Sequence, residues 1–168
     1  MPVSLWRRTL WVLCAVAVSA CMTRPGQSEL TSCTYPDSVR TPAPGFICGQ
    51  PLEGYPLTRL ISSPSSDTSA EQRIENGRRS IQNQLVLEWT QAWYSALPGT
   101  QRDRAQALVY DWLSEELRVV RTRTSPAGTI WILVGLNRTA EQAREVLDRR
   151  LRSAGITPPQ PSTEQELP

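Results

Sequence analysis

The sequence predicts an α+β domain, in which two helices pack on one face of a small antiparallel sheet of about three to four strands. Apolar residues recur at helical spacing after Ser69 and again after Thr139. Between these stretches, two β-rich runs at 117–124 and 129–136 flank a Ser-Pro-Ala-Gly turn sequence. These three observations together favour helices combined with an antiparallel hairpin.

The N-terminal segment has the three zones of a secretory signal peptide. Arg7 and Arg8 form a positively charged start, 9–18 is apolar, and small residues precede Cys21. A membrane-spanning helix needs about 20 apolar residues, so this run is too short to be one. We therefore predict a signal peptide at 1–20 in preference to a transmembrane anchor.

The end of this segment, Val-Ser-Ala-Cys at 18–21, resembles the lipobox of bacterial lipoproteins. The resemblance implies cleavage after Ala20 and a diacylglyceryl thioether on Cys21, instead of an ordinary cleaved signal. Several acyl chains anchor durably, because each buried methylene contributes about 0.8 kcal/mol. Met22 stands where Asp would imply retention in the inner membrane. We therefore expect the periplasmic side of the outer membrane, with 21–32 as a tether.

The charge balance argues against a nucleic-acid partner. Two of the 18 basic residues lie in the predicted signal peptide, and all 16 acids follow it, so the mature chain is formally neutral. The chain has no His, which removes the side chain best suited to acid–base catalysis at neutral pH. We predict no metal site and no cofactor.

Two cysteines remain after Cys14 leaves with the signal peptide and Cys21 is lipidated. Cys33 and Cys48 form an even pair in an oxidising compartment, which predicts a disulfide worth about 3 kcal/mol. Two free buried thiols are the alternative, and a catalytic cysteine would lack a His to activate it. Five prolines between 33 and 57 predict a disulfide-stapled loop here.

A short strand at 57–61 and a long helix are expected next. Ser69 is the predicted N-cap, with Gln72 at the third helical position, and Pro98-Gly99 is the predicted end. Gly77 weakens the helix by about 1 kcal/mol relative to Ala. The predicted apolar face consists of Ile74, Ile81, Leu85, Trp89, Ala92 and Ala96, widened by Val86, Trp93 and Leu97.

Residues 101–116 fit two interpretations. Alternation of Ala107 and Val109 favours a strand at about 104–111 followed by one helical turn, whereas Leu108 and Trp112 could continue a helix. We favour the strand.

The hairpin and the last helix are clearer. The turn at 125–128 suits type I, and the run at 129–136 is apolar on both faces, as a central strand is. A capping box from Thr139 to Gln142 begins the last helix, and Gly155 caps its end.

The domain is expected to span 33–156. Residues 157–168 contain four prolines and no apolar run, which is typical of a disordered tail.

Several short motifs resemble the LPP-type twenty-kilodalton lipoproteins. These are Cys-Thr-Tyr-Pro at 33–36, Ala-Pro-Gly-Phe-Ile-Cys at 43–48, Pro-Leu-Glu-Gly at 51–54 and the hairpin at 117–136, which has Trp131 where Tyr is usual. The resemblance covers 33–153. It implies an outer-membrane lipoprotein without known catalytic residues, and some members of that family are associated with the flagellar motor.

Carboxylates are the only candidates for catalysis. Asp111, Glu115 and Glu116, or Glu71 with Glu75, could work as acid–base pairs if their environments separated their pKa values. They occur in strongly charged segments, where helix capping and solubility explain them better. We therefore do not expect an enzyme.

Two further sets of side chains could bind something. Arg118, Arg121 and Arg123 project from the predicted exposed strand and could contact lipid headgroups or an acidic partner, although a solvated strand face also accounts for them. Tryptophans could line a ligand or glycan site, although a chain with one Phe needs them as core volume. These are Trp89, Trp93, Trp112 and Trp131.

Two hypotheses of function follow. The first is a structural or scaffold lipoprotein of the cell envelope that forms a homo-oligomer or docks on an envelope protein, such as part of the flagellar motor. The second is a monomeric binding module that uses the tryptophans for an apolar or glycan ligand.

Overall fold

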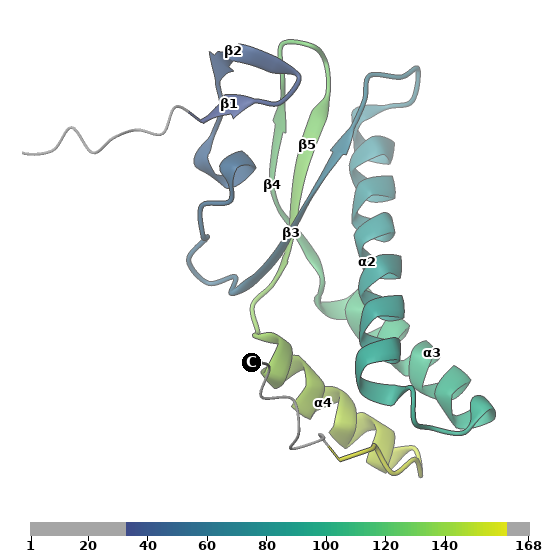
Figure 1. Cartoon of the computed structure of the whole chain (residues 1–168). Helices are drawn as coiled ribbons and strands as arrows, with labels where there is room; N and C mark the ends of the chain where they lie inside the picture. The colour runs from purple at the N-terminus through teal and green to yellow at the C-terminus, as the bar shows by residue number, and fades with distance from the viewer. Residues whose placement is uncertain (1–32, 161–168) are drawn as a thin grey trace, which may run out of the picture. The chain divides into compact units, whose positions relative to one another are not determined.

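The computed structural model describes residues 33–160 (Figure 1). The predicted signal peptide, the predicted lipidation site Cys21 and the predicted tether lie outside the described residues, as does 161–168. The elements in chain order are β1 Thr34–Tyr35, β2 Ser38–Pro42, the 3-10 helix η1 Gly45–Cys48, β3 Leu57–Ser63, α2 Ala70–Tyr94, α3 Gly99–Glu116, β4 Arg118–Thr124, β5 Ile130–Leu136 and α4 Ala140–Ser153.

The predicted α+β class is confirmed, with three helices among the described residues where two were predicted. β3, β5 and β4 form an antiparallel sheet in that order, and β1 and β2 form a separate two-stranded sheet. α2 packs on the three-stranded sheet, α3 packs on α2, and α4 packs on α3 (Figure 1). Within 33–160, no helix is long and apolar enough to cross a membrane.

The central position predicted for the 129–136 strand is confirmed. β5 pairs with β3 on one side and β4 on the other, so that Ile132 lies between Ile61 and Thr122. Alternate residues of β5 join the core that α2 covers, because successive side chains of a strand point to opposite faces. These are Ile130, Ile132, Val134 and Leu136.

α2 begins as predicted, since Ser69 Oγ accepts a hydrogen bond from Gln72 N at 3.2 Å. It ends at Tyr94, one turn before the predicted Pro98-Gly99 boundary. Gly77 is buried against the sheet, and a Cβ added there would lie 2.6 Å from Ile132 Cδ1. The glycine therefore lets the helix approach the sheet closely.

The strand predicted at about 104–111 is wrong, because this segment belongs to α3. Its buried residues include Ala105, Val109 and Trp112, at spacings of four and three, which is one helix face. Ala107, which the alternating pattern placed inside, is exposed. The buried side chains pack between α2 and α4. This tertiary packing favours a helix, which the local alternation of residues did not indicate.

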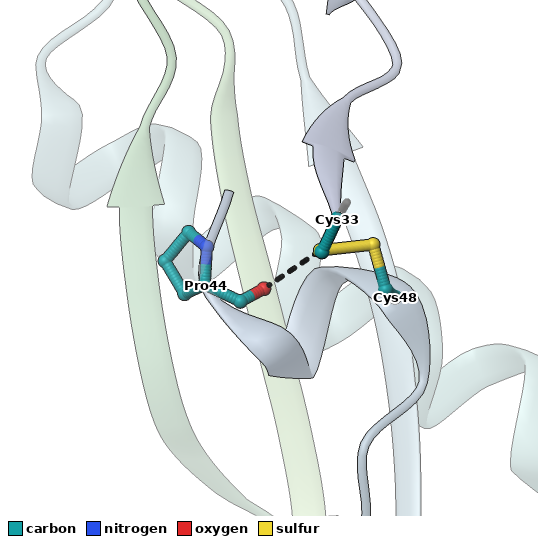
Figure 2. Close-up of a disulfide and its surroundings, with 3 residues drawn as sticks. All are labelled: Cys33, Pro44 and Cys48. Carbon is teal, nitrogen blue, oxygen red and sulfur yellow. Dashed lines mark hydrogen bonds between the residues drawn. A yellow bond between two sulfur atoms is a disulfide. The ribbon is translucent and has the colours of Figure 1, made fainter. Parts of the chain in front are cut away.

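The N-terminal segment is more regular than the predicted loop. β1 pairs with β2 within it, and the five-residue strand β2 is mostly exposed. The Cys33–Cys48 disulfide is formed as predicted, with Cα atoms 5.8 Å apart (Figure 2). The dashed contact in Figure 2 joins Cys33 Sγ to Pro44 O at 3.4 Å. A disulfide sulfur carries no proton, so this contact adds no donated hydrogen bond.

Both predicted ends of the last helix are confirmed. Thr139 and Gln142 make the two reciprocal bonds of a capping box. Gly155 adopts a φ of 76°, and the bonds from Gly155 N to Arg152 O and from Ile156 N to Leu151 O complete a Schellman cap. The first residues of the segment predicted as a tail also contact the domain. Pro158 is buried, and Arg144 Nη2 donates to Pro159 O at 3.5 Å.

Candidate interaction surfaces

The three arginines proposed as an interaction surface lie on β4, which is an edge strand of the sheet. Arg118 pairs with Gly135, Arg121 with Leu133 and Arg123 with Trp131. All three partners alternate with the β5 residues that face α2. Because directly opposite residues of paired strands share a face, the three arginines project from the face turned away from α2. We call Arg118, Arg121 and Arg123 the arginine row.

A β-bulge creates this row. The pairing of β4 with β5 shifts between Val119 and Arg121, which leaves Val120 without a partner. In a regular strand, residues three apart such as Arg118 and Arg121 point to opposite faces. The extra residue brings Arg118 onto the same face as Arg121 and Arg123.

The arginine row carries positive charge that the described residues do not neutralise. All three side chains are exposed, and none takes part in the ion pairs found within 33–160. The one hydrogen bond here runs from Arg121 Nη1 to Val120 O at 3.1 Å. The guanidinium groups are thus available to an external partner.

The disulfide-stapled segment, which consists of residues 33–56 before β3, covers part of the same sheet face. η1 contacts β5, and a side chain at Gly135 would lie 3.1 Å from Tyr55 Cδ1. At the hairpin turn, Ser125 Oγ donates to Asp37 Oδ2 at 2.6 Å. This hydrogen bond, followed by one from Thr129, lowers the pKa of Asp37 below its usual value. The disulfide closes this segment on itself, and Asp37 ties it to the hairpin turn.

The tryptophans mostly serve the core. Trp89 is 3 % and Trp112 is 1 % exposed, and Trp89 stacks on Trp93 with ring centroids 4.6 Å apart. Trp93 and Trp131 are half-buried. Trp131 Nε1 is buried without a hydrogen-bond partner within the described chain. The pair Trp89 and Trp112 therefore cannot offer an open platform to a ligand.

The carboxylates considered for catalysis lie in helix surfaces. Glu115 accepts a hydrogen bond from Arg150 Nη2 at 3.0 Å. Glu75 pairs with Arg78 at 2.7 Å, and the hydrogen bond from Arg78 holds the pKa of Glu75 below its usual value. Glu71 is exposed in the first turn of α2 and Glu116 is half-buried at the end of α3. Within 33–160, no three acidic or Cys side chains are grouped to hold a metal ion.

A groove between α2 and α3 was not predicted from the sequence. It has a volume of about 620 Å³ and contains two of the three large hydrophobic residues that are exposed within 33–160, Leu87 at 62 % and Tyr110 at 42 % exposure. Its lining consists of Asn83, Val86, Leu87, Asp103, Gln106, Ala107, Tyr110 and Asp111. One wall of the groove is the helix α3. Because a strand was predicted at about 104–111, the sequence did not predict the groove.

A buried polar contact holds the two walls of this groove together. Gln82, 1 % exposed, donates from Nε2 to Tyr110 O at 3.0 Å. Its own Oε1 accepts from Arg78 Nη1 at 3.2 Å, and Arg78 is in turn paired with Glu75. Because each polar atom of the Gln82 amide has a partner, α2 and α3 are fixed in register beside the groove.

No family model matches the sequence, and no curated protein matches it either.

Proposed function

We propose that this chain is a periplasm-facing lipoprotein, anchored to the outer membrane through Cys21, whose domain docks on a protein partner as a structural element of the cell envelope. The observation that carries the docking role is the arginine row, three guanidinium groups on one face of an edge strand that form no ion pair within 33–160.

The anchoring rests on the N-terminal sequence. The charged, apolar and small-residue zones lead into Val-Ser-Ala-Cys at 18–21. A disulfide between Cys33 and Cys48 supports an oxidising compartment such as the periplasm. Residues 22–32, fully extended, would span about 36 Å, so an anchored domain could reach partners well above the bilayer.

The docking role follows from the chemistry of arginine. Guanidinium groups present donors in a fixed fork that matches carboxylates, and they lose less hydration on contact than ammonium groups do. Three such groups along one strand favour an acidic protein surface of similar length. The resemblance of 33–54 and 117–136 to the LPP-type lipoproteins supports a scaffold role, and an assembly such as the flagellar motor is the kind of partner it suggests.

Site-specific photo-crosslinking tests the docking role on the membrane-bound chain. We expect benzoylphenylalanine at position 121 to give discrete adducts of fixed mass in bacterial envelopes. The matched control places it at Arg149, an exposed arginine of α4 that makes no ion pair within 33–160. Adducts from 149 as abundant as those from 121, or none from 121, would contradict docking through the arginine row.

A further inference from the structure

We propose that the partner of the arginine row is a second copy of this chain, which receives the row in its α2/α3 groove. The inference rests on the proposed docking role and names the partner. The inference is carried by two surfaces of opposite charge, the arginine row and the groove, whose charged side chains form no ion pair within 33–160.

The groove is the acidic counterpart of the row. Asp103 and Asp111 line it and are exposed, and neither belongs to an ion pair within the described residues. The row and the groove cannot meet within one copy, because the row projects from the sheet face turned away from α2. An intermolecular contact would neutralise both.

The spacing of the charges matches. Asp103 and Asp111 are eight residues apart on α3, which is about 12 Å at 1.5 Å per residue. Arg118 and Arg123 lie opposite Gly135 and Trp131, four residues apart on β5. That separation is about 13 Å at 3.3 Å per residue. The two ends of the row can therefore meet the two carboxylates together.

The centre of the groove suits the middle of the row. Ala107 lies midway between the two aspartates, and Arg121 lies midway along the row opposite Leu133. Leu87 can cover the aliphatic stems of the arginines, and the exposed ring of Tyr110 offers a face on which a guanidinium can stack. The contact thus buries two of the large hydrophobic side chains that the single domain leaves exposed.

The interface is head-to-tail, because it joins two different surfaces. Each copy that uses its row still has a free groove, so copies add to one another and form a ring or a filament. A lipid anchor would hold the copies on one surface and favour this association.

Cysteine cross-linking of the full chain in envelopes tests the arrangement. In a chain carrying both Ala107→Cys and Arg121→Cys, we expect oxidation to give a ladder of multiples of the chain mass. Two co-expressed chains that carry one substitution each should stop at dimers. The control chain combines Ala107→Cys with Arg149→Cys and should give no ladder.

Charge reversal then tests the pairing. Asp103→Arg with Asp111→Arg should abolish the ladder, and adding Arg118→Asp with Arg123→Asp to the same chain should restore it. All four residues are exposed, so folding should survive. Dimers from Arg121→Cys alone, or a ladder insensitive to charge reversal, would overturn the head-to-tail contact.

The two proposals fail differently. Adducts from position 121 to another envelope protein, without a ladder, would overturn the self-association and leave docking through the arginine row standing. The absence of any adduct from position 121 would remove both.

Discussion

Gly77 of α2 lies directly against Ile132 of β5, so closely that a Cβ at position 77 would stand 2.6 Å from Ile132 Cδ1 and 3.3 Å from Ile61 Cγ2. The helix thus contacts the central strand through backbone at this point. This contact holds α2 on the sheet. Because α2 also forms one wall of the groove between α2 and α3, the contact helps to position that wall.

Gly77→Ala should therefore destabilise the domain. The gain in helix propensity is about 1 kcal/mol, whereas overpacking a filled core costs about 1–3 kcal/mol. Urea unfolding should show a lower midpoint. Ile132→Val removes Cδ1, so the double variant should recover part of the loss. Asn76→Ala, at the exposed neighbouring position, is the control. A stabilised Gly77→Ala variant would contradict the close contact.

Replacing Cys33 and Cys48 by Ser should lower the free energy of unfolding by about 3 kcal/mol. The effect should begin locally, because the main core cluster contains no residue of the disulfide-stapled segment. Hydrogen exchange should rise within 33–48 while α2 stays protected. Reductant added to the unaltered protein should reproduce the change. Equal protection with and without the disulfide would count against this.

Tyr94→Phe should destabilise the domain by about 1 kcal/mol. The variant loses the bond from Tyr94 Oη to Asp148 Oδ1, which is 2.9 Å long, and leaves the half-buried carboxylate with Arg144 at 3.9 Å. Thermal unfolding at neutral pH checks this. A variant as stable as the parent would show that the bond adds no net stability.

The same tyrosine predicts alkaline sensitivity. Burial, and next the charge of Asp148, raise the pKa of Tyr94 well above its ordinary value of 10.0. A raised folded-state pKa contributes stability that is present below about pH 10 and is lost above it, because the unfolded chain then releases the proton. Stability should fall more steeply above about pH 10 in the parent than in Tyr94→Phe. Parallel curves would contradict the assignment.

The link between Asp37 and Ser125 should be acid-labile. The pKa of Asp37 is lowered by the Ser125 and Thr129 hydroxyls. The stability that Asp37 contributes is therefore present above pH 3.8, its ordinary pKa, and is lost as the pH falls through its lower pKa in the folded state. Hydrogen exchange in 33–44, corrected for intrinsic rates, should rise on acidification in the parent. Asp37→Asn should show raised exchange at every pH, and no pH response in the parent would refute the link.

Local patterns predicted the elements whose signals do not depend on distant contacts. The cap at Ser69, the capping box at Thr139 and the turn at 125–128 are set by neighbouring residues, and each stands where it was expected. The central position of β5 followed from apolar side chains on both of its faces.

The candidate surfaces depend on tertiary structure and were only partly predictable. The exposed arginines of β4 were expected. Residues three apart share a strand face only if a bulge lies between them, however, and the sequence around Val120 contains no signal that predicts a bulge. The groove was not predicted because the alternation of Ala107 and Val109 favoured a strand. The segment is instead the helix α3, which packs between α2 and α4.

The mass of the mature N-terminal peptide tests the central claim most directly. Mass spectrometry of the protein extracted from bacterial membranes should find Cys21 as the first residue, with the added mass of a diacylglyceryl thioether. Cys21→Ser should lose the lipid and leave the membrane fraction, whereas Cys14→Ser, within the predicted signal peptide, should change neither. A mature chain that begins elsewhere, or an unmodified Cys21, would contradict the lipoprotein assignment.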